Sequence, residues 1–152
     1  MKYNFQQYIG ISLHRTDLVL LGQAKQAVEP LGVTPEQNLI MMLLWSGMEG
    51  ITQKEIAARI GRDQTNVARM LLQLEKKGFI TRTQAKNDRR AQMVRLTDTG
   101  RVLEQEVIEA TNRFHARLLQ GLTEEEVESF KRVLAKLEHN ATTESAEEQS
   151  DL

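Results

Sequence analysis

Residues 53–77 constrain the fold of this chain most strongly, because they hold two helix patterns separated by a glycine-centred turn. Thr52 and Glu55 have the spacing of a capping box, which predicts a helix start. Gly61 predicts the end of that helix, since a residue without a β-carbon enters the left-handed region at little cost. Asp63 then caps a second helix, whose apolar face is formed by Val67, Met70, Leu71 and Leu74. The segment therefore predicts a helix-turn-helix pair.

The outward face of the second helix begins with side chains suited to base recognition. A helix-turn-helix presents this N-terminal end to the major groove. Asn and Gln can bond adenine in two places, Arg can do the same to guanine, and the Thr methyl can meet that of thymine. The predicted DNA-contacting residues here are Arg62, Gln64, Thr65, Asn66 and Arg69. The alternative is a polar surface helix that carries amides without a ligand.

Positive charge is concentrated in the same part of the chain. The formal net charge of the 152 residues is −1, but residues 52–101 hold twelve Lys or Arg against five acids, a local net charge of +7. A basic segment between acidic flanks is typical of a module that meets a polyanion with one face. Charge alone leaves open a solvated charged surface.

A β-hairpin is predicted directly after the second helix. Residues 79–83 and 92–96 are rich in strand formers and flank a polar segment. The basic residues at or beside its tip are Lys86, Arg89 and Arg90. Such a tip suits a narrow minor groove, whose negative potential attracts arginine. Asp88 can accept hydrogen bonds from the Arg90 guanidinium and fix its direction, or it can be a turn former without a partner.

Helices are predicted on both sides of this lobe. Apolar residues recur at helical spacing over about 5–29 and again over 97–139, and a buried helix starts at Thr34. The outer stripes require a partner surface, which a second copy of the chain would supply, unless they close a monomeric core. The acidic tail 140–152 is expected to be disordered. The predicted fold is mainly α with a small β-hairpin wing (α+β), as one domain over 1–139.

Composition removes several other classes of function. The chain has no cysteine, which excludes disulfides and thiolate metal sites, and His14, His115 and His139 are scattered without a carboxylate pattern. No nucleophile elbow, phosphate loop or paired acid and base indicates an enzyme, so no catalytic residue and no cofactor is expected. The N-terminus lacks the pattern of a signal peptide, and no apolar run could span a membrane, so we expect a cytoplasmic protein.

Three segments carry a resemblance to a known family. They are LEKKGFI at residues 74–80, NDRRA at 87–91 and VRLTDTG at 94–100. With the order of the predicted elements, they resemble the MarR (multiple antibiotic resistance regulator) family of bacterial winged helix-turn-helix repressors. The resemblance covers nearly the whole chain. It implies a helix-turn-helix at 53–77 and a wing at 79–96.

The resemblance also implies a mechanism. The chain would act as a homodimer, joined by its terminal helices, that binds a palindromic operator in double-stranded DNA. It would regulate transcription as a repressor. Residues 64–69 match the major-groove readers, Arg90 the wing arginine that enters the minor groove, and Asp88 its anchoring carboxylate. The rival interpretation is a winged helix that contacts an acidic protein partner without binding DNA.

Members of this family often release DNA when a small aromatic or phenolic ligand binds between the dimerisation helices and the DNA-binding lobe. The side chains here that could line such a pocket are Tyr8, His14, Arg15, Met41, Met42 and Trp45. Aromatic and Met residues at helical spacing are also typical of an ordinary core. The absence of cysteine excludes the thiol-based peroxide sensing used by some relatives.

Overall fold

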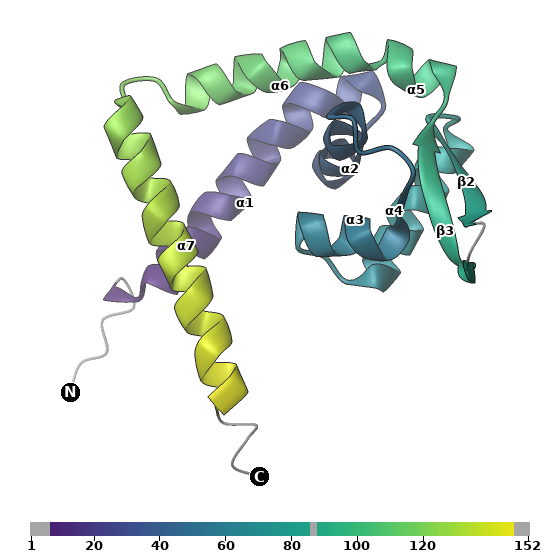
Figure 1. Ribbon diagram of the computed structural model, residues 1–152. Helices are drawn as coiled ribbons and strands as arrows, with labels where there is room; N and C mark the ends of the chain where they lie inside the picture. Colours follow the sequence, from purple (N-terminus) through teal and green to yellow (C-terminus); the bar gives the residue numbers. More distant parts are fainter. Residues whose placement is uncertain (1–6, 86–87, 148–152) are drawn as a thin grey trace. The chain divides into compact units, whose positions relative to one another are not determined.

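The computed structural model describes residues 7–85 and 88–147 (Figure 1). The chain divides into two compact units, Met1–Phe114 and His115–Leu152. The elements are α1 (Ile9–Val28), the 3-10 helix η2 (Glu29–Leu31), α2 (Pro35–Trp45), β1 (Ile51–Thr52), α3 (Gln53–Ile60), α4 (Gln64–Lys76), β2 (Ile80–Ala85), β3 (Asp88–Leu96), α5 (Asp98–Val102), α6 (Glu104–Leu118) and α7 (Glu124–Glu147). The prediction of a mainly helical chain with a small antiparallel sheet is confirmed.

Three helices begin at a capping box, as their sequences predict. The Thr34 hydroxyl accepts from the backbone N–H of Gln37, and the Gln37 side chain accepts from that of Thr34, which completes the capping box of α2. Thr52 and Glu55 form the same reciprocal pair at α3. Thr123 and Glu126 form the pair at α7. These starts are local because each box satisfies two helix N–H groups within four residues.

A three-stranded antiparallel sheet forms the wing and its base. Its strand order is β1-β3-β2, with Ile51 paired to Val94 and Ile80 to Leu96. The hairpin β2–β3 was predicted, but β1 was not. With only two residues, β1 is too short to show the alternation that identifies a strand.

The core of the first unit lies where α2, α3 and α4 meet the sheet. Its fully buried side chains come from all of these elements and from α6: Ile40, Met41, Leu44, Ile56, Val67, Leu71, Leu74, Ile80, Val94 and Val107. α4 contacts both α3 and β2, so it lies between the first helix of the pair and the wing (Figure 1). This packing presents one face of α4 to the core and leaves the other outside.

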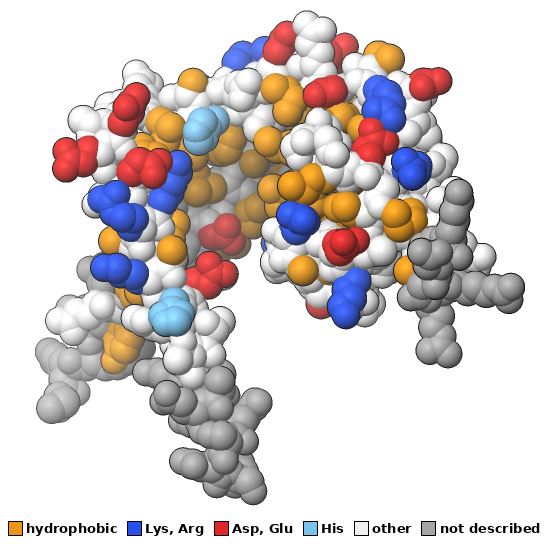
Figure 2. Space-filling model, viewed as in Figure 1, with side chains coloured by type: hydrophobic (Ala, Val, Ile, Leu, Met, Phe, Trp, Pro, Cys, Tyr) orange, Lys and Arg blue, Asp and Glu red, His pale blue; other side chains and the backbone are white. Residues whose placement is uncertain are grey.

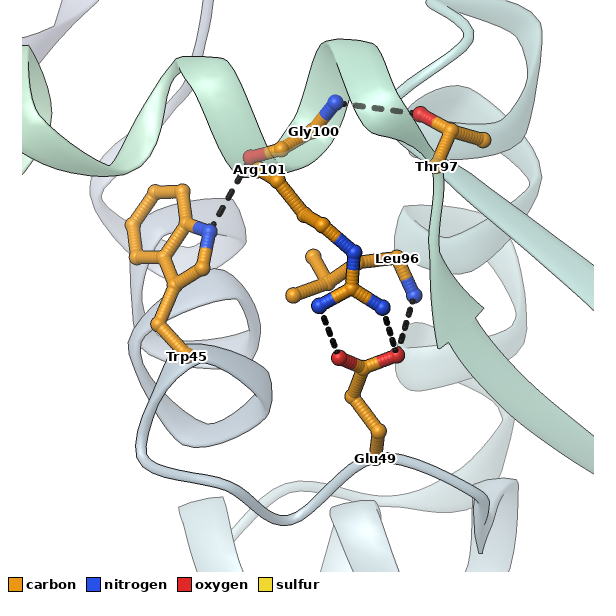
Figure 3. A network of polar contacts seen from close by, with 6 residues as sticks. All are labelled: Trp45, Glu49, Leu96, Thr97, Gly100 and Arg101. Carbon is orange, nitrogen blue, oxygen red and sulfur yellow. Dashed lines mark hydrogen bonds and ion pairs between the residues drawn. The ribbon is translucent and has the colours of Figure 1, made fainter.

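A polar network joins the end of α2 to the wing and α5 (Figure 3). The Glu49 carboxylate accepts from the Arg101 guanidinium, at 2.9 Å for Nη2, and from the backbone N–H of Leu96 at 3.2 Å. Arg101 therefore holds the pKa of Glu49 below its usual value. The Trp45 indole N–H donates to the carbonyl of Gly100 at 3.0 Å. The loop before β1, the end of β3 and α5 are thus fixed to one another.

Two expected boundaries differ in the structure. α1 begins at Ile9, later than the expected start near Phe5, which lies outside the described residues. The helical stretch expected from 97 to about 119 is two helices, α5 and α6, which meet at Leu103. The hydrophobic pattern continues across this junction, so spacing alone did not reveal it.

The tail expected to be disordered is helical over residues 140–147, because α7 continues to Glu147. Composition describes whether a segment can build its own core, whereas extending an existing helix adds one hydrogen bond for each residue ordered. The hydroxyls of Thr142 and Thr143 also donate to the carbonyl of His139, at 3.0 and 2.9 Å. Their hydrogen-bond donors therefore find a partner within the helix. Residues 148–152 lie outside the described residues.

Gly100 provides a test of the α5 junction. A β-carbon at this position would lie 2.0 Å from the carbonyl oxygen of Phe79, so the backbone must move to admit one. We expect Gly100→Ala to lower the free energy of unfolding by about 1–3 kcal/mol, measured by urea denaturation. Gly22→Ala is the matched control, since a β-carbon there meets nothing within 4 Å, and alanine is the better helix former. Equal stability of the two variants would refute the close approach.

Candidate nucleic-acid interface

α3 and α4 form the predicted helix-turn-helix. Gly61 ends α3 in the left-handed conformation, with φ 65°, and its backbone N–H donates to the carbonyl of Ala57. Ala57 and Ile56 are buried on α3 and Val67 is buried on α4, while Ile60 is half-buried. The buried Ala57 leaves room for close packing on α3, and Gly61 forms the turn that the sequence predicts.

The N-terminal face of α4 is exposed. Each of the five residues predicted to contact DNA in this region is exposed: Arg62, Gln64, Thr65, Asn66 and Arg69. Figure 2 shows Lys and Arg side chains standing out from the surface over α3 and α4. Arg62, Asn66 and Arg69 also line one polar recess of about 420 Å³. The structure therefore places these predicted contacts on one continuous surface.

Hydrogen bonds fix the start of α4. The Asp63 carboxylate accepts from the backbone N–H of Asn66 at 2.9 Å, which is the predicted N-cap. This backbone hydrogen bond, followed by one from the Asn66 side chain, holds the pKa of Asp63 below its usual value. Gln53, on α3, donates from its side chain to the carbonyl of Gln64 at 3.1 Å. The spacing gave no sign of this Gln53 contact, because it joins residues on different helices.

An ion pair links the other end of α4 to the wing. The Glu75 carboxylate accepts from Arg82 Nη2 at 2.6 Å and Nε at 3.1 Å, and from the backbone N–H of Arg82 at 3.2 Å. Arg82 is the main reason that the pKa of Glu75 lies below its usual value. Charge-assisted bonds of this two-pronged form also restrict orientation. The first strand of the wing is thereby tied to the helix that carries the exposed face.

The wing tip is described only in its backbone. Asp88, Arg89 and Arg90 begin β3, and Asp88 pairs with Ala85 across the hairpin. Lys86 lies outside the described residues. The minor-groove contacts and the Asp88–Arg90 hydrogen bond therefore stay predictions.

An apolar cavity of about 220 Å³ lies among α1, α2 and α6. Leu20 and Ala24 of α1, Met42 of α2 and Phe114 of α6 contribute to its wall. Figure 2 shows hydrophobic side chains gathered near the junction of these helices. Asn38 also lines the cavity; its Nδ2 donates to the Thr111 hydroxyl, and its buried Oδ1 has no partner among the described residues.

Of the residues predicted to form a ligand pocket, only Met42 lines this cavity. The other five are not brought together. Met41 is fully buried in the core, and Trp45 packs against the core while bonding Gly100. Tyr8, His14 and Arg15 are exposed on or beside α1. Sequence spacing missed the cavity because its apolar walls, including Leu20 and Ala24, resemble ordinary core residues.

Residues 7–85 and 88–147 contain no group of three His, Asp or Glu that could hold a metal ion. No helix among them is long and apolar enough to cross a membrane.

Comparison with known proteins agrees with this geometry. Residues 33–91 match the model of the MarR family. The transcriptional repressor CouR bound to a 23-mer DNA duplex is 28% identical, over 90% of this chain and 99% of that chain, with a TM-score of 0.78. A mutant MarR from E. coli complexed with operator DNA is 25% identical, over 85% and 92% of the two chains, with a TM-score of 0.77.

A further structure shows the same fold. CouR from Rhodococcus jostii RHA1 bound to p-coumaroyl-CoA is 24% identical, over 90% of this chain and 95% of that chain, with a TM-score of 0.77. The family model covers the helix-turn-helix and the first part of the wing, and the similar regulators share the fold beyond it. By these matches residues 33–91 fit the MarR family model, and the chain is similar to winged-helix transcription regulators of that family.

Proposed function

We propose that this chain is a repressor that binds a palindromic operator sequence-specifically, through the exposed N-terminal face of α4. The observation that carries the proposal is the set of amide, hydroxyl and guanidinium groups exposed on a helix whose opposite face is buried. Such groups discriminate base edges in the major groove. DNA-bound structures of CouR and of a mutant MarR support the proposal by similarity.

Each surface has a distinct part in this proposal. Gln64, Thr65, Asn66 and Arg69 face the bases. Lys86, Arg89 and Arg90 of the wing grip the minor groove, and Asp88 holds the Arg90 fork. The ion pair between Glu75 and Arg82 keeps the wing and α4 in register, so both contacts are made together. The net charge of +7 over residues 52–101 attracts the phosphate backbone.

The binding form in this proposal is a homodimer. Among the side chains described between residues 115 and 143, none is buried, although α7 carries an apolar stripe. Phe130 and Val133 are 56% and 50% exposed. α1 likewise exposes Leu18 and Val19. A two-fold interface formed by the terminal helices would bury such stripes and set two copies of α4 about 34 Å apart, one turn of DNA.

The apolar cavity supports a further part of the proposal, which is release of DNA by a small aromatic or phenolic ligand. Its walls are largely hydrocarbon, as ligand sites usually are. The unpartnered Asn38 Oδ1 is an acceptor that a ligand hydroxyl could satisfy. Arg62 lines both this cavity and the polar recess that contains Asn66 and Arg69, so a ligand there would touch a wall shared with the DNA-facing surface.

Two substitutions test DNA recognition. Arg69→Ala is expected to relax the preference at one base pair in each half-site, a loss of about 1–3 kcal/mol of discrimination. Arg90→Ala should weaken binding to all sequences alike, since minor-groove and phosphate contacts carry little sequence information. Fluorescence anisotropy with operator and scrambled duplexes measures both effects. Arg113→Ala, which removes the same charge from the exposed face of α6, is the control.

Salt dependence separates DNA binding from the protein-partner alternative. Affinity for DNA should fall by at least about 100-fold between 50 and 200 mM salt, because several counterions are released on binding. A chain that shows no affinity for any genomic fragment at low salt, or keeps its affinity at high salt, would contradict the proposal and favour a protein partner.

The dimer is tested at Phe130. Sedimentation equilibrium at micromolar concentration should show twice the 17.4 kDa mass of the chain. Phe130→Glu should shift the population toward monomer, because it places a charge in the stripe that the proposed interface would bury. Ala135→Glu introduces the same side chain at an exposed position on the opposite side of α7, and should leave the mass unchanged. A wild-type chain that sediments only as monomer would rule the dimer out.

The cavity is tested by filling it. A panel of phenols and aromatic acids is first screened for release of the operator from the wild-type chain. The leucine of Ala24→Leu would extend into the cavity and take space from the ligand. The ligand concentration needed for release should rise by at least about 10-fold, because overpacking a site by a methylene group costs about 1–3 kcal/mol. Gln26→Leu, at an exposed position of the same helix, should leave that concentration unchanged. Equal responses of the two variants would place the ligand elsewhere, and a panel without effect would argue against ligand release.

A further inference from the structure

Three residues at the start of α4 form a continuous chain of side-chain hydrogen bonds. Asp63 accepts from Asn66 twice, through Oδ1 from the backbone N–H at 2.9 Å and through Oδ2 from the side-chain Nδ2. Asn66 Oδ1 in turn accepts from Arg69 Nη2 at 2.8 Å. The residues are three apart, so they follow one another up the same face of the helix.

The neighbours determine which way the Asn66 amide points. An ionised carboxylate can only accept hydrogen bonds, and a guanidinium can only donate them. The amide nitrogen must therefore face Asp63 and the amide oxygen must face Arg69. The depressed pKa of Asp63 keeps this carboxylate ionised at neutral pH, so the orientation persists.

Both polar ends of Asn66 are thus occupied. Two-pronged recognition of adenine needs the same two groups, since the amide oxygen accepts from N6 and the amide nitrogen donates to N7. These bonds use one N–H and one oxygen lone pair of the Asn66 amide, so an adenine would have to share that amide with both Asp63 and Arg69. Arg69 is in a different position, because it has five N–H donors and uses one on Asn66. The remaining donors suffice for the O6 and N7 acceptors of guanine.

We propose that Asn66 is a positioning residue, anchored by Asp63, that directs the Arg69 guanidinium toward a guanine. Asn66 and Arg69 then specify one base pair together, instead of an adenine and a guanine separately. This inference rests on the proposed binding of DNA through α4, and it assigns Arg69 as the side chain of this pair that touches the base.

The test is selection from a DNA library with randomised half-sites, followed by sequencing, for the wild-type chain and its variants. Arg69→Ala should reduce the preference for guanine at one base pair by about 10- to 100-fold. Asn66→Ala should reduce the preference at that same base pair and no other. The double variant should match Arg69→Ala, because Asn66 acts only through Arg69.

Two further variants serve as controls. Asp63→Ser keeps a hydroxyl that can cap the backbone N–H of Asn66, but removes the second oxygen that holds its Nδ2. It should lower the guanine preference at the same base pair while its thermal midpoint stays within a few degrees of the wild type. Thr65→Ala, outside the hydrogen-bonded chain, should add its effect independently to that of Arg69→Ala.

The outcomes separate this inference from the function on which it rests. If Asn66→Ala changes the preference at a different base pair, with effects that add to those of Arg69→Ala, Asn66 reads a base itself and the inference is wrong while DNA recognition stands. If the wild-type chain enriches no sequence, the proposed function fails as well. A guanine preference that survives Asn66→Ala and Asp63→Ser unchanged would also overturn the positioning role.

Discussion

The burial of one face of α4 is the constraint on which the rest of the structure depends. Val67, Leu71 and Leu74 are fully buried, so the helix cannot rotate without exposing all three. At about 25 cal/mol for each Å² of apolar surface, rotation would cost several kcal/mol. The opposite face is exposed as a result of that packing. Hydrophobic burial therefore decides which polar side chains of α4 are available for recognition.

Polar contacts then fix the position of α4 along its axis. Gln37, almost wholly buried on α2, donates to Gln73 at 2.8 Å and accepts from Lys77 at 2.8 Å. The Lys77 ammonium also donates to the carbonyl of Gly32 at 2.7 Å. These contacts hold the C-terminal end of α4 against the start of α2. Directional bonds complement apolar packing here, because packing alone permits small shifts that would misplace the groups proposed to contact base edges.

The exposed face of α4 was largely predictable because its determinants are local. Thr52, Gly61 and Asp63 act within one helical turn of their own positions, and the structure confirms each cap or turn. Other contacts were not predictable. The bond between Gln53 and Gln64 joins two helices, and the ion pair between Glu75 and Arg82 joins a helix to a strand. Neither helical nor strand periodicity predicts a contact between residues in different elements. The cavity lined by Asn38 depends on three helices at once.

The sequence by itself determined the order of the main elements, the starts of the capped helices and the identity of the exposed face of α4, because caps and hydrophobic periodicity act over a few residues. Only the tertiary structure decided which polar groups remain unpaired and which are already engaged. Asn66 illustrates this limit, since its residue type indicates a base-reading amide, whereas its hydrogen bonds to Asp63 and Arg69 occupy both ends of that amide. A spacing of three residues brings these side chains within reach, but only their geometry in the folded helix shows which of them bond.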